Sequence, residues 1–357
     1  GRHLMLFVWL DLVNEVRSVV GNPTSDSITS SLVSGIRWCA GAISHERYGE
    51  KGQLIAQQLR AWEDEIAPKD LIDRIRYWIA QNPWDVGVDT EDNPYAKLAD
   101  DVVTSAASVA ELEPEFSESK FINGTMAFAR ECGKRDSSNE LHDRIREWIS
   151  DGKSSIFVSG YLLGLQGENG LGKKWKAALD QVALEHPEYA ANVTIYIDVT
   201  KTGFHRLLRI IDAGYSEPRR IFAQLGYGGW LRVVTPEMQS EICRRLLEAS
   251  TSSDASAAAT ALDLLYMWKH VNDKELPNSL HQFVLQFLSA LIGSDARYDG
   301  HKWIDVAESV IPNNAAIISE LVLAILVDRT GRTSEATEQF DSLLADCARH
   351  DPSWERC

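Results

Sequence analysis

Leu71–Ala80 reads LIDRIRYWIA, and Leu141–Ser150 reads LHDRIREWIS. The two segments are identical at seven of ten positions and lie 70 residues apart. In each segment the apolar residues recur at helical spacing, so that Ile75, Trp78 and Ile79 fall on one face of a helix. Helical units that repeat along a chain and cannot bury their apolar faces alone are typical of stacked repeats. The pair therefore favours an α-solenoid of short helices.

The same offset of 70 residues relates a second group of apolar positions. It aligns Ile28, Leu32, Val33 and Ala40 with Leu98, Val102, Val103 and Ala110. Each repeated unit would then contain several short helices. The alternative is that unrelated amphipathic helices have converged on the same apolar stripe, and the sequence leaves both explanations open.

Helical periodicity extends over most of the chain and predicts an all-α fold. Segment 235–249 begins with Thr235 as a predicted N-cap and Pro236 at the first helical position. Alternation typical of strands is nearly absent, and the two candidates are Ser155–Leu163 and Val193–Val199. Both are short apolar runs, which fit a buried helix as well as a strand.

The expected organisation is one elongated array or two subdomains, because single cores stop growing at roughly 250–300 residues and this chain has 357. We predict helical repeats over 1–152, a middle helical region over 153–252, and further repeats over 253–357. The last region is expected to end in a hairpin like that of tetratricopeptide repeats. Its two helices would be 315–328 and 335–349, but the Trp and Tyr signature of that family is missing.

The composition is acidic, with 52 Asp and Glu against 36 Lys and Arg and a formal net charge of -16. This charge disfavours nucleic acid or anionic lipid as the main partner and favours a basic protein. The five cysteines are far apart and form no CxxC pair, which predicts a reducing cytoplasmic location and argues against a thiolate metal site. The apolar run Leu4–Leu10 is too short to span a membrane. Its apolar character, and the lack of an initiator Met, indicate a piece of a longer protein.

Gly167–Lys174 reads GENGLGKK and fits the phosphate-binding pattern G-x-x-x-x-G-K-[ST] at every position except the last. Gly167, Gly172 and Lys173 are therefore candidate nucleotide-binding residues, with Thr194–Asp198 as a possible second strand ending in an acid. Lys174 stands where a Mg²⁺-binding hydroxyl is needed, and its ammonium group would repel the cation. The alternative is an ordinary turn between two helices, with no cofactor.

Other motifs predict neither catalysis nor metal binding. No nucleophile elbow G-x-S-x-G occurs, and the nine His residues are scattered without a three-ligand set at metal spacing. The pair Arg244-Arg245 falls on a polar helix face and is expected to form ion pairs. Tyr227 and Trp230, in the glycine-rich stretch 226–231, are candidate partner-binding residues, although Trp230 could instead pack between helices.

Three further segments are similar to a known class of helical regions. Phe204–Gly214 reads FHRLLRIIDAG, Leu225–Leu231 reads LGYGGWL and Leu262–Met267 reads LDLLYM. Together they resemble the helical-repeat regions downstream of the motor domain in large bacterial P-loop proteins, namely signal-transducing NTPases and antiviral defence factors. In those families the repeat region senses or binds a partner, and catalysis lies elsewhere. The matching positions are packing residues, so the resemblance assigns no functional residue.

These observations lead to one expectation and two alternatives. We expect a non-enzymatic helical-repeat scaffold or sensor region that binds another protein. The first alternative is a degenerate P-loop protein using Gly167–Lys174, and the second is an oligomerisation module.

Overall fold

The computed structural model of the chain is helical, and none of the residues it describes forms a strand. The prediction of an all-α fold is confirmed. The described residues are 36, 49–66, 68–81, 83, 93–104, 106–117, 122–167, 170–226, 229–250, 255–272, 275–292, 300–328 and 336–350.

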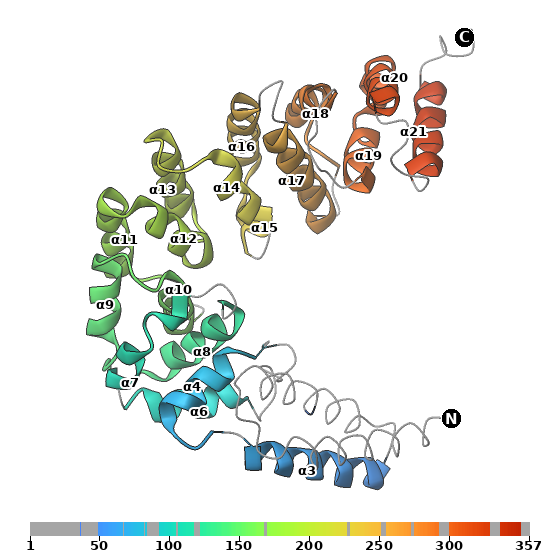
Figure 1. Cartoon of the computed structure of the whole chain (residues 1–357). Helices are drawn as coiled ribbons and strands as arrows, with labels where there is room; N and C mark the ends of the chain where they lie inside the picture. The colour runs from blue at the N-terminus through green and yellow to red at the C-terminus, as the bar shows by residue number, and fades with distance from the viewer. Residues whose placement is uncertain are drawn as a thin grey trace. The chain divides into compact units, whose positions relative to one another are not determined.

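The chain divides into two units, Gly1–Tyr189 and Ala190–Cys357, and each is described by itself. The boundaries expected at 152 and 252 stay predictions. The helices of the first unit are α3 (Gly49–Ile66), α4 (Leu71–Ile79), α6 (Pro94–Val102), α7 (Ala106–Glu111), η1 (Glu115–Ser117), α8 (Ile122–Arg135), α9 (His142–Ser150), α10 (Ser155–Gln166) and α11 (Lys173–Glu185) (Figure 1). Helix α12 (Pro187–Ile197) continues into the second unit.

The two repeated decapeptides form α4 and α9, and both helices bury the predicted stripe. The exposed fractions of Ile75, Trp78 and Ile79 are 0%, 9% and 1%, and those of the equivalent Ile145, Trp148 and Ile149 are 0%, 3% and 2%. Because identical side chains at the same helical spacing are buried in both copies, the apolar stripe alone decides which face of each helix points inward.

Helix α8 is the centre of the first unit and contacts α4, α6, α10 and η1. It lies against α10 at backbone distance because glycines occur where the helices meet. A methyl group at Gly133 would lie 2.0 Å from the carbonyl oxygen of Tyr161, and one at Gly164 would lie 2.0 Å from that of Arg130. Any larger residue at these positions would force the helices apart.

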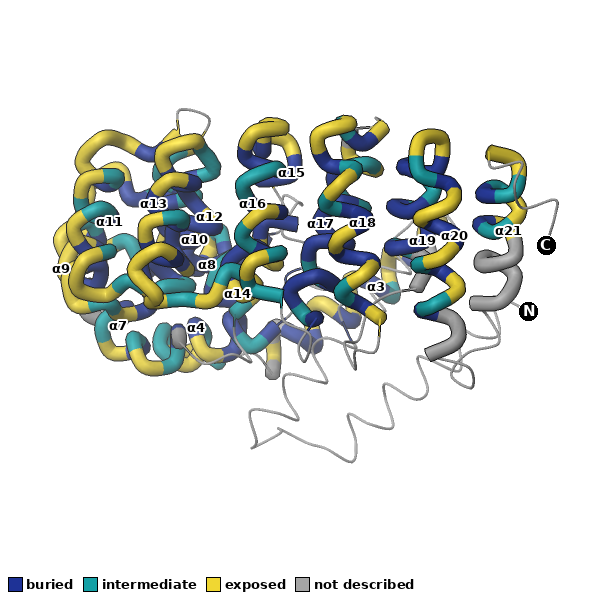
Figure 2. Tube along the Cα trace, turned by 90° about the horizontal axis from the view of Figure 1, so that it is seen from above, coloured by how far each residue is buried: buried dark blue, intermediate teal, exposed yellow. Residues whose placement is uncertain are grey.

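The second unit contains α13 (Lys201–Asp212), α14 (Pro218–Phe222), η3 (Ala223–Gly226), α15 (Trp230–Val233), α16 (Pro236–Ala249), α17 (Ser256–Asn272), α18 (Asn278–Leu291), α19 (Gly300–Glu308), α20 (Ile311–Asp328) and α21 (Ala336–His350). From α16 onward each helix contacts the helix after the next, as in α16 with α18, α18 with α20, α17 with α19, and α19 with α21. Consecutive helices are also in contact, from α16 with α17 through to α20 with α21. Figures 1 and 2 show these helices side by side.

Several helix ends follow directly from the sequence. Thr235 caps α16 as predicted, because its hydroxyl accepts a hydrogen bond from the backbone N–H of Met238, and Pro236 begins the helix. Helices α9 and α13 both end at a glycine with positive φ, Gly152 at 66° and Gly214 at 75°. At each end the next two N–H groups bond back to the last turn, as in a Schellman motif.

The two candidate strands are both helical. Ser155–Leu163 lies in α10, and Val193–Val199 lies in the last turns of α12 and the corner after it. Both runs are mainly apolar and mostly buried, and periodicity alone cannot separate such a helix from a buried strand. The predicted helices before residue 49, the second group of repeat positions at 28–40, and the turn of the C-terminal hairpin lie outside the described residues.

Candidate interaction surfaces

The P-loop-like stretch joins two helices. Gly167 ends α10 with a φ of 49°, Gly172 is the N-cap of α11, and Lys173 is its first residue and is exposed. A P-loop needs a buried strand before the glycine turn, but the element before Gly167 is α10. The geometry is that of the alternative reading, a turn between helices.

Asp198, the acid that would end the second strand of a nucleotide site, forms an ion pair within the protein. Asp198 lies in the corner between α12 and α13, where its carboxylate and the guanidinium of Arg206 form an ion pair with an N–O distance of 2.9 Å. Both side chains are fully buried, and Arg206 also donates to the hydroxyl of Thr194 at 3.2 Å. Thr200 donates to the same carboxylate at 2.7 Å. A buried charge needs such partners, so Asp198 holds the corner together.

Trp230 is a packing residue of the second unit. Its side chain is 1% exposed, and its indole N–H donates to the backbone carbonyl of Ile195 at 2.6 Å. The alternative in which it packs between helices is therefore the one that the structure supports, and its ring is not at the surface. Tyr227, the other candidate partner-binding residue, lies outside the described residues.

Polar and aromatic side chains from α17 and α19 meet on one surface, which we call the α17–α19 face. The ammonium group of Lys269 lies 3.0 Å from a carboxylate oxygen of Asp305 and donates to its backbone carbonyl at 2.9 Å. The imidazole of His270 lies 3.3 Å from the same carboxylate oxygen and 4.3 Å from the ring of Tyr266, centroid to centroid. The sequence does not indicate this face, because Lys269 and Asp305 lie 36 residues apart on helices that share no motif.

The α17–α19 face is partly exposed, whereas the apolar side of α17 is buried. His270 is 51% exposed at its side chain, and Asp305 is 29% exposed. Figure 2 shows α17 largely in the buried colour, while α20 alternates between buried and exposed residues. A face with a half-exposed aromatic ring beside charged groups has the mixed character that protein-binding surfaces use.

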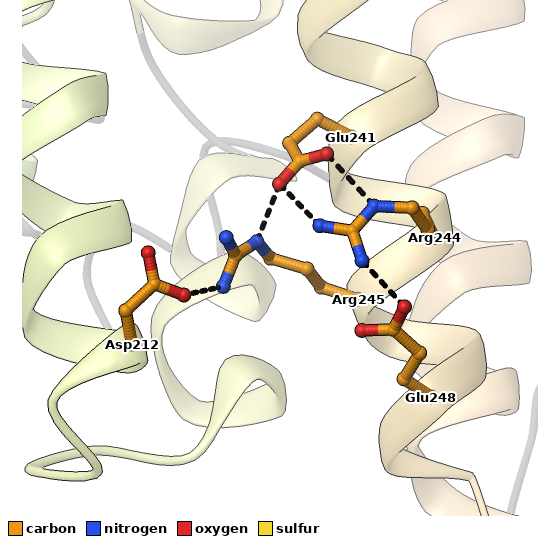
Figure 3. Close-up of polar contacts among 5 residues, drawn as sticks. All are labelled: Asp212, Glu241, Arg244, Arg245 and Glu248. Carbon is orange, nitrogen blue, oxygen red and sulfur yellow. Dashed lines mark hydrogen bonds and ion pairs between the residues drawn. The ribbon is translucent and has the colours of Figure 1, made fainter.

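A network of charges joins α13 to α16 (Figure 3). The carboxylate of Glu241 accepts hydrogen bonds from Arg244 at 2.7 and 3.0 Å and from Arg245 at 2.6 Å. Arg244 also bonds to Glu248, and Arg245 bonds to Asp212 at the end of α13. The prediction that Arg244 and Arg245 form ion pairs is confirmed.

The network sets the protonation of its members and orients α16. Hydrogen bonds from Arg244 and then Arg245 lower the pKa of Glu241, and the bond to Glu241 raises the pKa of Arg244. Because Arg245 is only 15% exposed and binds carboxylates on two different helices, it is the residue that ties α16 to α13. The guanidinium group of Arg245 is therefore already bound to carboxylates of the protein itself.

The described residues contain neither a candidate metal site nor a candidate membrane-spanning helix. No group of three or more His, Cys, Asp and Glu side chains in the described part of the chain could hold a metal ion. Across the same residues, no helix is both long enough and apolar enough to cross a bilayer. Comparison with known proteins also found no matching family model, no similar curated protein and no similar solved structure.

Proposed function

We propose that the chain is a non-enzymatic α-solenoid scaffold or sensor that binds another protein. The observation that supports it most directly is the stacking from α16 to α21, where each helix contacts the helix after the next. Stacked helix pairs of this kind give extended surfaces that recognise partner proteins. The resemblance to helical regions of bacterial signalling and defence NTPases favours the same role.

The partner-binding surface in this proposal is the α17–α19 face. Its partly exposed Tyr266 is of a residue type that contributes strongly at interfaces, the exposed His270 lies against it, and apolar residues of α17 are buried beneath them. The formal net charge of -16 favours a basic partner and speeds the encounter with it.

The test begins with partners identified by cross-linking the full chain in its native cells and then purified. The double variant Tyr266→Ala, His270→Ala should weaken binding of such a partner at least about tenfold. The control variant Gln282→Ala, Gln286→Ala removes two exposed side chains of α18 in the other layer and should bind normally.

Two results would contradict the proposal. Purified candidates that do not bind the chain would remove the protein-binding role, and hydrolysis of Mg-ATP by the chain that is lost in Lys173→Ala would replace it with an enzymatic one. An association rate that does not change with salt would exclude electrostatic steering toward a basic partner.

A further inference from the structure

The equivalent arginines of α4 and α9, Arg76 and Arg146, have different neighbours. In α4, Arg76 bonds to Glu115 at 2.9 Å and to Asp73 at 3.2 Å, and the bond to Glu115 raises its pKa. In α9 the equivalent Arg146 has no carboxylate partner among the residues that the structure describes. Its guanidinium lies over the ring of Trp175, 5.9 Å from the centroid.

Two more cations lie beside Trp175 at the start of α11. Lys173 and Lys174 are both exposed, and in the described part of the chain neither makes an ion pair. This differs from the arginines of α16, which are all bound to carboxylates. In a chain with a net charge of -16, three cations at one place with no carboxylate partner among the described residues need an explanation.

Helices α9 and α11 bring these cations together because they run in the same direction. His142 in the first turn of α9 lies 4.7 Å from Trp175 in the first turn of α11, ring to ring. At the other end of the pair, Gly152 lies against the ring of His186. The amino ends of both helices, which carry partial positive charge, therefore lie at the same end as the cations.

Among the described residues, the carboxylates near the amino ends of α9 and α11 do not neutralise the three cations. Glu147 is bound to Arg144 at 2.7 Å, and Asp136 is buried beneath the first turn of α9. Asp143 on α9 and Glu140 in the turn before it are exposed, so the surface holds two acids among its cations. Among the described residues Arg146, Lys173 and Lys174 have no carboxylate partner, and two helix amino ends add partial positive charge, so the balance of the described groups here is positive.

We propose that Arg146, Lys173, Lys174 and Trp175 form a surface that binds an acidic segment of a protein partner, and we call it the cationic surface. The inference rests on the proposed protein-binding function and adds the chemistry of one contact. A short acidic segment fits better than nucleic acid, because a long polyanion would meet the acidic remainder of the chain. Trp175 holds Arg146 in place, so its charge is positioned before the partner arrives.

The test uses fluorescence anisotropy with a fluorescein-labelled Glu-Gly repeat peptide at low salt. The triple variant Arg146→Gln, Lys173→Gln, Lys174→Gln should bind the peptide about tenfold more weakly, since each exposed charge contributes modestly. A control variant with the same change in net charge, Lys201→Gln, Arg219→Gln, Arg232→Gln, should stay within about twofold of the unmodified chain. The single variant Lys174→Glu changes only one exposed side chain and should also weaken binding of the peptide.

Three outcomes would overturn the inference. The peptide could fail to bind the unmodified chain, both triple variants could lose binding equally, or single-stranded DNA of the same charge could bind more tightly through the same three cations. A partner that binds the chain and is unaffected by the triple variant contradicts this inference alone. The absence of any protein partner contradicts the proposed function instead.

Discussion

Helices α4 and α9 bury the same three side chains, but different residues hold their amino ends and their polar sides. Asp70 caps α4 directly, accepting hydrogen bonds from the N–H groups of Ile72 and Asp73. Leu141, at the equivalent end of α9, has no side-chain cap. Asp136, buried and five residues earlier, accepts from the N–H of Leu141 at 3.1 Å instead.

The carboxyl ends differ as well. Helix α9 ends in the Schellman turn at Gly152. After α4, the hydroxyl of Tyr95 on α6 donates to the backbone carbonyl of Trp78 in the last turn at 3.1 Å and to that of Gln81, just past the helix, at 3.2 Å. Two nearly identical sequences thus have the same buried face, while their caps and polar contacts differ. The apolar stripe is a local property, and the charges are free to be used differently in each copy.

The largest test of this comparison removes the shared tryptophan from each copy. Trp148→Ala should lower the free energy of unfolding by about 4 kcal/mol and Trp78→Ala by about 3 kcal/mol. Both rings have aromatic neighbours, but Trp148→Ala should cost more because Trp148 is 3% exposed and Trp78 is 9% exposed. Urea unfolding followed by circular dichroism measures both. A larger loss for Trp78→Ala would mean that the first copy is the better packed one.

The next test concerns the close packing of α4 against α8. A methyl group at Gly124 would lie 2.0 Å from the carbonyl oxygen of Ile79, so Gly124→Ala should destabilise the chain by about 2–3 kcal/mol. Gly172→Ala is the matched control, because its nearest neighbour would be the Trp175 ring at 3.9 Å, and it should cost less than about 1 kcal/mol. Thermal unfolding of the two variants compares them, and equal melting temperatures would rule out the close backbone contact.

The two amino-terminal caps differ in their expected effect. Asp136→Ala should cost about 2–3 kcal/mol, because it also leaves the buried hydroxyl of Tyr161 without the carboxylate that it bonds at 2.6 Å. Asp70→Ala removes only an exposed cap and should cost about 1 kcal/mol. Both values come from urea unfolding at neutral pH. If Asp70→Ala were the more damaging change, the capping of α9 by Asp136 would be unimportant.

The smallest expected effect separates the two arginines by their response to salt. Arg76→Gln should cost about 0.5 kcal/mol at low ionic strength and nothing measurable at about 1 M salt, since screening weakens exposed ion pairs. Arg146→Gln should cost no more than this and should respond little to salt, because its contact is with an aromatic ring. Unfolding measured at both salt concentrations decides the matter. The same salt response in both variants would indicate a carboxylate partner for Arg146.

The sequence predicted the helices well because their signals are local. The stripe Ile75, Trp78 and Ile79 and the cap at Thr235 both depend on residues within one or two turns, and both are found. For Val193–Val199 the sequence left strand and helix open, because a mostly buried helix has no clear polar face from which its period can be recognised. The glycines around Trp230 suggested exposure, but a hydrogen bond to Ile195, 35 residues away, holds the ring inside.

The candidate surfaces were less predictable, because they depend on which helices become neighbours. Nothing in the sequence around Lys269 indicates Asp305, which lies 36 residues later. The stretch Gly167–Lys174 drew attention as a phosphate motif, yet the feature that matters in our proposal is the approach of Arg146 to Trp175. Residues far apart in the chain make each surface, so a single sequence cannot specify it.

The enclosed pair of Arg206 and Asp198 has a consequence for dynamics. Water cannot reach the guanidinium protons while α12 and α13 stay together, because both side chains are fully buried. These protons can therefore exchange with solvent only when the corner opens. Their exchange rate, followed by nuclear magnetic resonance, would show how often this joint in the second unit separates.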